Sequence, residues 1–376
     1  MRHQKNWLAG SVGLAVLLLA LFLTSRNSIS INPEAMMAAV TNTATPPLNV
    51  FSRSKEAYLH LTSPVFGFIS KIVNLQTPGP FLPKDILSVT NPEPASPTKN
   101  IENSLVNIFC SKKLDKIRKV VTGSGALITE NLVLTNAHVA IWPLIADSNS
   151  AVSCLIRTGS PAKATHSVRV VFVSPNWIQK NGKLINSAYT ESGQDDYAIL
   201  KISPLINSRT NLSSYGLAPI QMEENVPEVG SPIKVAAYPA NVLGVKGVDA
   251  ALSSKTERLS VRNLNTFIGG SGTGLSYETD IIETSPSSIG QQGSSGGIIA
   301  DENNHLIGLI STVTDSPSGG KFIHGLTIYS LNKALGYYSN GGLSKILLLG
   351  SNSLEETFNQ SYRKPLTSLL TNTLGI

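Results

Sequence analysis

Beyond residue 101 the sequence is divided into many short apolar runs, and this pattern constrains the fold more than any other feature. The runs are separated by Gly, Asn, Ser and Pro and rarely show a helical period. Among the clearest are Ser104–Phe109, Ala126–Thr129, Leu132–Thr135, Ser167–Val173, Tyr197–Ile202, Pro232–Ala237, Asp280–Glu283, Gly297–Ala300 and Leu306–Thr314. Short strands at such spacing are typical of β-barrels and β-sandwiches. Because a polar connector over 204–214 splits the runs into two comparable halves, the sequence predicts an all-β protein with two β units.

The amino terminus carries an uncharged, largely apolar stretch, Trp7–Leu23, preceded by Arg2 and Lys5. Its length suits a short transmembrane helix or a long secretory h-region. No A-x-A cleavage pattern follows it, which favours an uncleaved signal anchor within residues 1–25, with a cleaved signal peptide as the alternative. Positive charge before the helix places the amino terminus in the cytoplasm and the rest of the chain outside. We therefore expect a single-pass membrane protein, or a secreted one if the signal is cleaved.

Residues 26–100 differ in character from the β-type region. Pro breaks this spacer into short pieces, and residues 54–75 have apolar positions that could form an amphipathic helix. The Pro-rich stretch over 91–98 is typical of an extended linker. These features place the start of the globular region near Ile101.

Composition excludes several classes of protein. Apolar residues make up 41% and charged residues 14% of the chain, which is unlike a wholly disordered protein. The densest basic run lies over 112–119 and has no interleaved aromatic residues that could stack on bases, so we interpret it as a solvated hairpin rather than a nucleic-acid site. The two cysteines, Cys110 and Cys154, form no cluster at metal-ligand spacing, and we expect no metal and no cofactor.

Two motifs supply a candidate base and a candidate acid. An apolar strand ends in Leu134-Thr135-Asn136-Ala137-His138-Val139, which would expose one imidazole. Histidine can act as general base and then general acid near neutral pH. In a strand that begins at Asp195-Asp196, alternation places Asp196 on the face of the apolar residues and Asp195 on the other face. A buried carboxylate needs a hydrogen-bond partner, which an imidazole N–H would provide.

A third motif supplies a candidate nucleophile. Gly293-Ser294-Ser295-Gly296-Gly297 precedes a strand-like run. A nucleophilic hydroxyl needs a tight turn that exposes Oγ and directs backbone N–H groups at the substrate carbonyl, and glycine permits such a turn. Each motif alone also suits a structural residue or a flexible loop, but the order His, Asp, Ser is that of chymotrypsin-type enzymes.

With these motifs, the stretch from about Ser104 to Ala334 resembles the trypsin-like serine proteases of the chymotrypsin fold. In style it is closest to bacterial Deg-type (HtrA) enzymes. Gly123-Ser124-Gly125 with Leu134–Val139 resembles their G-S-G and L-T-N-x-H-V signature, and Asp196–Lys201 resembles D-x-A-x-L-K. The resemblance implies two antiparallel six-stranded β-barrels, about 101–203 and 215–330, within a protease domain over 101–338. A tail with short helices would follow over 339–376, too short for the PDZ domain of Deg-type enzymes.

The resemblance also implies the role of each site residue. Ser295 would be the nucleophile, His138 the general acid and base, and Asp196 the group that orients it. The backbone N–H groups of Gly293 and Ser295 would form the oxyanion hole. Ile289 stands where trypsin has its specificity aspartate, so the pocket for the P1 side chain would favour uncharged groups. The strand carrying Ile310, Ser311 and Thr312 would pair with the substrate backbone.

The cysteines gain an interpretation once the first barrel is assigned. Both lie on strands of that barrel, and exported proteins meet oxidising conditions. We therefore predict a Cys110–Cys154 disulfide, with two small buried side chains as the alternative.

The sequence thus predicts an extracytoplasmic serine endopeptidase that acts on proteins or peptides. The alternatives are an inactive protease-fold scaffolding protein and an esterase that uses the same three residues.

Overall fold

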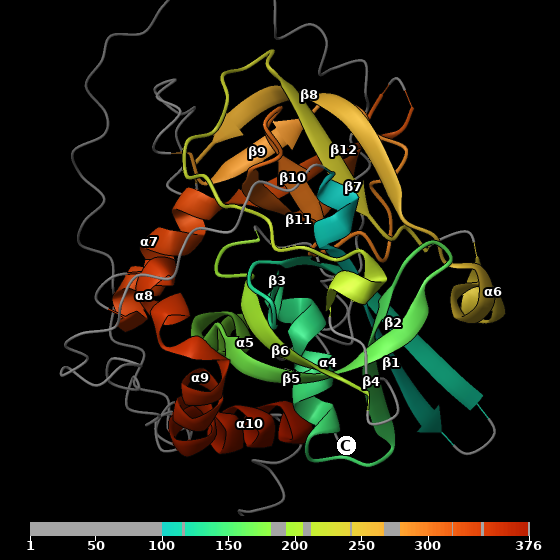
Figure 1. Cartoon of the computed structure of the whole chain (residues 1–376), viewed down its shortest axis with the longest axis vertical. Coiled ribbons are helices and arrows are strands. Elements are labelled where there is room, and N and C mark those ends of the chain that lie inside the picture. Colours follow the sequence, from blue (N-terminus) through green and yellow to red (C-terminus); the bar gives the residue numbers. More distant parts are fainter. Residues whose placement is uncertain are drawn as a thin grey trace, which may run out of the picture. The chain divides into compact units, whose positions relative to one another are not determined.

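A computed structural model describes most of the chain beyond residue 99 (Figure 1). The described residues are 100–114, 117–181, 193–205, 212–240, 243–266, 279–317, 319–339 and 342–374. The predicted membrane segment at 7–23 and the predicted helix at 54–75 lie outside these residues. Within the described ranges, no helix is long and apolar enough to cross a membrane.

The first half of the described chain forms a closed antiparallel barrel. Its strands are β1 (Leu105–Leu114), β2 (Ile117–Leu127), β3 (Leu132–Thr135), β4 (Val152–Thr158), β5 (Lys163–Val173) and β6 (Ala198–Pro204). They follow the order β1-β2-β3-β6-β5-β4, with β1 also paired to β4. Helix α4 (Ala137–Ala146) follows β3, and α5 (Pro175–Asn181) follows β5. The polar residues that separate the apolar runs lie in the turns.

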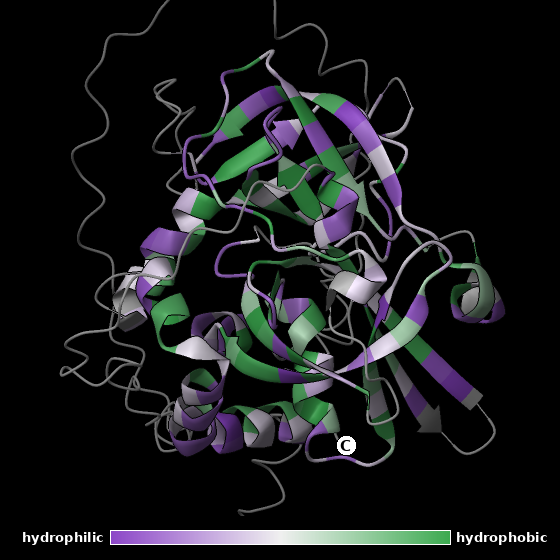
Figure 2. Ribbon diagram, in the orientation of Figure 1, coloured by the Kyte–Doolittle hydropathy of each residue, from purple (hydrophilic) through white to green (hydrophobic). Residues whose placement is uncertain are grey.

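The second half forms another closed antiparallel barrel, the upper one in Figure 1. Its strands are β7 (Pro232–Ala237), β8 (Lys255–Asn265), β9 (Ile281–Thr284), β10 (Ile298–Ala300), β11 (Leu306–Asp315) and β12 (Lys321–Thr327), in the order β10-β11-β12-β9-β8-β7. Polar and apolar segments follow one another along β8 (Figure 2), and its buried residues are the apolar Val261 and Leu264. The two six-stranded barrels confirm the predicted chymotrypsin-like fold. Helix α6 (Gly244–Ala251) lies between β7 and β8.

The chain then continues as α7 (Ile328–Ser339), α8 (Gly342–Leu348), α9 (Gly350–Phe358) and α10 (Lys364–Leu374), with a π-helical turn over Asn359–Arg363. Helix α9 packs on β5, and α10 packs on α4 and α5. These helices contribute an apolar stripe to the large hydrophobic cluster that includes the core of the first barrel: Leu354, Phe358, Tyr362, Leu366 and Leu370. Burying one side chain of this size contributes about 1.5–3 kcal/mol relative to leaving it exposed. The segment expected as a tail is therefore an outer layer of the first barrel.

Ion pairs reinforce this layer. Glu355 on α9 accepts a hydrogen bond from Lys201 at 2.6 Å and pairs with Arg169 at 3.2 Å. The two cations hold the pKa of Glu355 below its usual value although its partial burial acts in the opposite direction.

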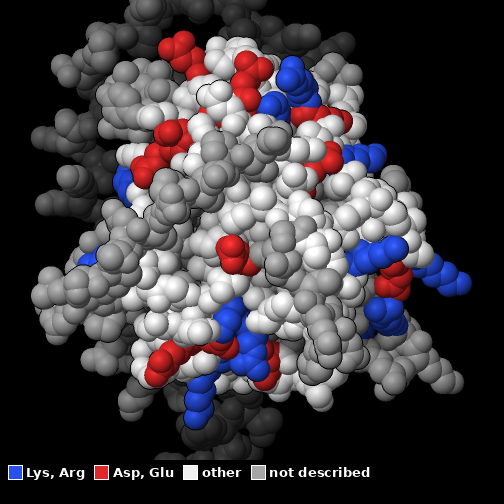
Figure 3. Space-filling model, in the orientation of Figure 1, with Lys and Arg blue, Asp and Glu red and all other residues white. Residues whose placement is uncertain are grey.

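On the face shown in Figure 3, acidic and basic side chains are interspersed.

The predicted disulfide is confirmed. Cys110 on β1 lies directly opposite Cys154 on β4, and their sulfur atoms are bonded. The bond closes a loop with a sequence separation of 44 residues. Such a cross-link stabilises a fold by about 2–4 kcal/mol, mainly by restricting the unfolded chain.

Candidate active site

His138 stands where β3 gives way to α4. The four residues of β3 are buried, and α4 begins at Ala137, so His138 lies in the first turn of the helix. Its backbone N–H has no partner within the helix and instead donates to Asp196 Oδ1 at 3.0 Å. Its Nδ1 lies 2.8 Å from Asp196 Oδ2. One carboxylate therefore fixes both the start of α4 and the imidazole.

Asp196 is completely buried, as predicted, although it precedes β6, and the His138 side chain is 29% exposed. The carboxylate also accepts a hydrogen bond from Ser311 Oγ at 2.9 Å. Asn136 Nδ2 donates to the Asp196 carbonyl at 2.9 Å. The carboxylate thus has three partners, the His138 N–H, His138 Nδ1 and Ser311 Oγ, which satisfy it in its buried position. In this arrangement the imidazole carries its N–H on Nδ1.

The pKa of His138 reflects two opposing causes. Burial lowers it, but the charge of Asp196 and the hydrogen bond to that carboxylate raise it by more. The net result is a pKa above the usual 6.5.

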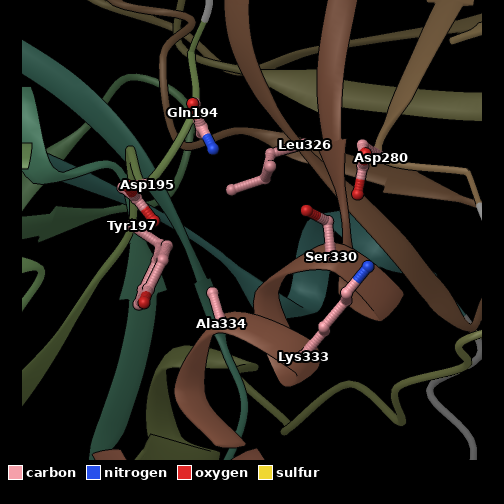
Figure 4. A pocket seen from close by; sticks show the side chains of 8 residues that line it. All are labelled: Gln194, Asp195, Tyr197, Asp280, Leu326, Ser330, Lys333 and Ala334. Carbon is pink, nitrogen blue, oxygen red and sulfur yellow. The ribbon is translucent and has the colours of Figure 1, made fainter. Parts of the chain in front are cut away.

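The neighbouring Asp195 faces elsewhere. It occupies a left-handed backbone conformation with φ of +62° and pairs with Lys180 at 3.2 Å. Its side chain lines a cavity of about 260 Å³ beside α7, together with Tyr197 and Lys333 (Figure 4). The two side chains point in different directions, as predicted, but the cause is the left-handed turn at Asp195 and not strand alternation, because β6 begins only at Ala198.

The turn that carries Ser295 requires its glycines. Gly293 has φ of +92°, and a Cβ there would lie 2.5 Å from the Tyr238 carbonyl oxygen. Gly296 has φ of +81°, and a Cβ there would overlap the Ser124 carbonyl and Thr135 Oγ1. The Ser294 side chain is buried and donates to the Ile289 carbonyl, whereas Ser295 is partly exposed. Of the two serines, Ser295 is therefore the one available to react.

Backbone contacts bring this turn to the His138–Asp196 pair. The N–H of Ser124 donates to the Ser295 carbonyl at 2.7 Å, and the N–H of Gly296 donates to the Ile310 carbonyl at 2.8 Å. Ile310 precedes Ser311, which binds Asp196. Among the described residues no hydrogen bond joins Ser295 Oγ to His138. Asp196 and His138 are thus in direct contact, whereas Ser295 is connected to them through the backbone of its turn.

Two backbone N–H groups of the turn point away from the protein groups that hold it. The Gln292 carbonyl accepts from Ala240 N at 2.8 Å, and the Ser294 carbonyl accepts from Gly297 N at 2.8 Å. In a trans peptide the N–H points opposite to the carbonyl, so the N–H groups of Gly293 and Ser295 face the other side. Within the described part of the chain neither donates a hydrogen bond. A pair of free donors on one turn can stabilise an oxyanion.

The four residues predicted to bind substrate lie in different environments. Ile289 and Ile310 are buried in the core of the second barrel, and Ser311 donates to Asp196. Thr312 lines a small hollow that His324 shares. The role of Ser311 as a donor to the acid was missed, because no local pattern indicates a contact between residues so far apart in the sequence.

Comparison with protein families supports the same assignment of fold. A model of the trypsin-like peptidase domain family matches residues 123–309. The active form of the Rv3671c protease from M. tuberculosis is similar, with 18% identity and a TM-score of 0.39 over 68% of this chain and 94% of that one. The HtrA-type protease AlgW with a decapeptide has 17% identity and a TM-score of 0.38 over 63% of this chain and 64% of that one. No curated protein sequence matches the chain.

Proposed function

Since the chain belongs to the trypsin-like peptidases, we propose that it is a serine endopeptidase that hydrolyses peptide bonds with Ser295, His138 and Asp196. The observation that carries the proposal is the buried Asp196 carboxylate on His138 Nδ1, beside a glycine turn that leaves Ser295 partly exposed. An ion pair that served only stability would not need a tight glycine turn that exposes a serine nearby.

The mechanism follows from these positions. Ser295 Oγ attacks the peptide carbonyl and passes its proton to His138 Nε2, while Asp196 stabilises the imidazolium through Nδ1–H. The N–H groups of Gly293 and Ser295 bind the oxyanion. His138 then protonates the leaving amine, which gives an acyl-enzyme on Ser295. Water, deprotonated by His138, hydrolyses this ester and regenerates the enzyme.

Labelling with a fluorophosphonate tests the proposal. The native full chain is expected to label on Ser295, and Ser295→Ala and heat-denatured protein are expected to remain unlabelled. Absence of labelling in folded wild type would falsify the enzyme assignment and favour a scaffolding role. Cleavage of a peptide library then distinguishes a peptidase from an esterase.

The same library reports the P1 side chain that the enzyme accepts. A Cβ added to Gly290 would lie 3.2 Å from Val313 Cγ1 and Ile323 Cγ1, and Ile289 is buried. The Glu257 carboxylate beside this wall already accepts hydrogen bonds from Ser287 Oγ and the Ser288 N–H. A basic P1 group would therefore lose its hydration without a free carboxylate among the described residues of the wall. We therefore expect uncharged P1 residues, and a preference for Lys or Arg would contradict the proposed pocket.

We further propose that the peptidase works outside the cytoplasm. The Cys110–Cys154 disulfide is typical of an oxidising compartment, and the apolar stretch at 7–23 follows positive charge. Determination of the mature amino terminus separates a membrane anchor from a cleaved signal, and a reduced cytoplasmic protein would contradict both.

Activity is expected to fall in mild acid. His138 must be neutral to accept the proton of Ser295, and its pKa is raised above 6.5. The acid limb of kcat/KM should therefore have its midpoint above pH 6.5. For stability the sign is opposite: the pKa is higher in the folded state, so the His138–Asp196 contact stabilises fully at pH below 6.5 and weakens as the pH rises through the folded-state pKa. A flat profile of kcat/KM down to pH 4 would contradict the role of His138.

A further inference from the structure

We propose that Ser124 is a positioning residue for the oxyanion-binding turn, an inference that rests on the proposed function. Ser124 lies on β2 of the first barrel and is completely buried. Its hydroxyl donates to the Gly293 carbonyl at 2.8 Å and accepts from the N–H of Tyr238 at 2.9 Å. Its N–H donates to the Ser295 carbonyl at 2.7 Å.

The direction of the hydroxyl proton follows from its partners. The N–H of Tyr238 can only donate and the carbonyl of Gly293 can only accept. Ser124 Oγ–H therefore points at Gly293, and no other arrangement satisfies all three buried groups. Loss of the hydroxyl would leave a buried carbonyl and a buried N–H without this partner.

Four consecutive peptide groups of the turn are held by hydrogen bonds at their carbonyls. The Gln292 carbonyl is held by Ala240 N, the Gly293 carbonyl by Ser124 Oγ, the Ser294 carbonyl by Gly297 N and the Ser295 carbonyl by Ser124 N. The Gly293 carbonyl is the one held by a side chain. It lies between the two peptide groups whose N–H groups are free, so its orientation sets their angle to each other.

Gly293 makes this contact important. A residue without Cβ at φ of +92° has many alternative backbone conformations, so its peptide groups need outside partners to stay in one orientation. Preorganised donors stabilise a transition state because they need no reorientation during the reaction. The Ser124 hydroxyl supplies such a restraint from a strand of the other barrel.

The same residue connects the turn to the base. The Ser124 carbonyl accepts from Thr135 Oγ1 at 2.7 Å, and Thr135 ends β3 just before the helix that carries His138. Ser124 therefore contacts both the residue that leads to the base and the turn that carries nucleophile and oxyanion donors.

The test compares Ser124→Ala with Ser104→Ala in the full chain. Ser104 is also completely buried in the first-barrel half, and its Oγ donates to the Ala218 carbonyl at 2.7 Å, but it does not contact the turn. Ser124→Ala is expected to lower kcat by about tenfold to a hundredfold, because oxyanion donors would be misdirected. KM should change by less than about threefold, because ground-state binding remains. Amide hydrogen exchange of the peptide over 290–297 should become faster in Ser124→Ala alone.

The outcomes separate this inference from the proposed function. If both variants lost kcat equally, in proportion to the decrease in their Tm, Ser124 would have only a structural role, and the inference would be overturned. If wild type neither labels nor cleaves peptides, the proposed function fails, and the exchange data still decide whether Ser124 holds the turn. Unchanged exchange over 290–297 in Ser124→Ala would overturn the inference in either case.

Discussion

Asp196→Asn is expected to lower kcat by about 10⁴-fold while the protein remains folded. An amide of the same shape can retain hydrogen bonds to the His138 backbone and Ser311. It presents an N–H, however, where the carboxylate accepts from His138 Nδ1, which favours the tautomer that leaves Nε2 protonated and unable to act as base. It also removes the charge that stabilises the imidazolium. Steady-state kinetics with a cleavable peptide and a thermal melt measure both effects.

Asp195→Asn is the matched control for this substitution. Asp195 is adjacent in sequence, lines the cavity beside α7 and pairs with the largely exposed Lys180. Asparagine tolerates the left-handed conformation at this position, and the substitution removes only the charge paired with Lys180, whose side chain is 55% exposed. Its kcat should stay close to that of wild type. A loss below tenfold in Asp196→Asn would contradict the proposed role of Asp196.

Gly293→Ala is expected to lower kcat by about 10²–10³-fold, the effect of losing an oxyanion donor. Its methyl group would lie 2.5 Å from the Tyr238 carbonyl oxygen and 3.0 Å from Ala240 Cβ. Both neighbours belong to the segment that holds the Gln292 carbonyl, so the turn must move to relieve the contact. The rate of fluorophosphonate labelling should fall with kcat.

Gly230→Ala separates the clash from backbone strain. Gly230 has the same φ of +92°, but a Cβ there has nothing within 4 Å. Both alanine variants therefore carry a cost for the left-handed conformation of about 1–2 kcal/mol, while only Gly293→Ala disturbs the turn. If Gly230→Ala lost as much activity as Gly293→Ala, the effect would be one of global stability.

Local sequence patterns predicted the strands and the tight turn at Ser295, because both depend on the conformation of neighbouring residues. Short apolar runs between turn residues predicted the strands. The opposite directions of Asp196 and Asp195 were also predicted, but they come from a left-handed turn before β6 and not from strand alternation. The glycines around Ser295 predicted a tight turn because few other residues adopt its conformation. The two-barrel architecture came from the resemblance, since register between distant strands has no local signal.

Long-range contacts could not be predicted in this way. The bonds of Ser311 to Asp196 and of Ser124 to Gly293 join residues 115 and 169 positions apart, and they exist only once two barrels are packed together. The C-terminal helices did have a signal. Leu354, Phe358, Tyr362, Leu366 and Leu370 recur every fourth position, the spacing of one helix face. The wider π-helical turn over Asn359–Arg363 lies in the middle of this stripe.

The packing of α10 on α4 has a consequence for synthesis. All six strands of the first barrel have been made once Pro204 is added, yet the helix that carries His138 gains its outer cover only when Leu366 and Leu370 have followed. The whole second barrel is made in between. Both barrels are therefore synthesised before the residues that cover α4, so the outer face of the helix that carries His138 is completed last.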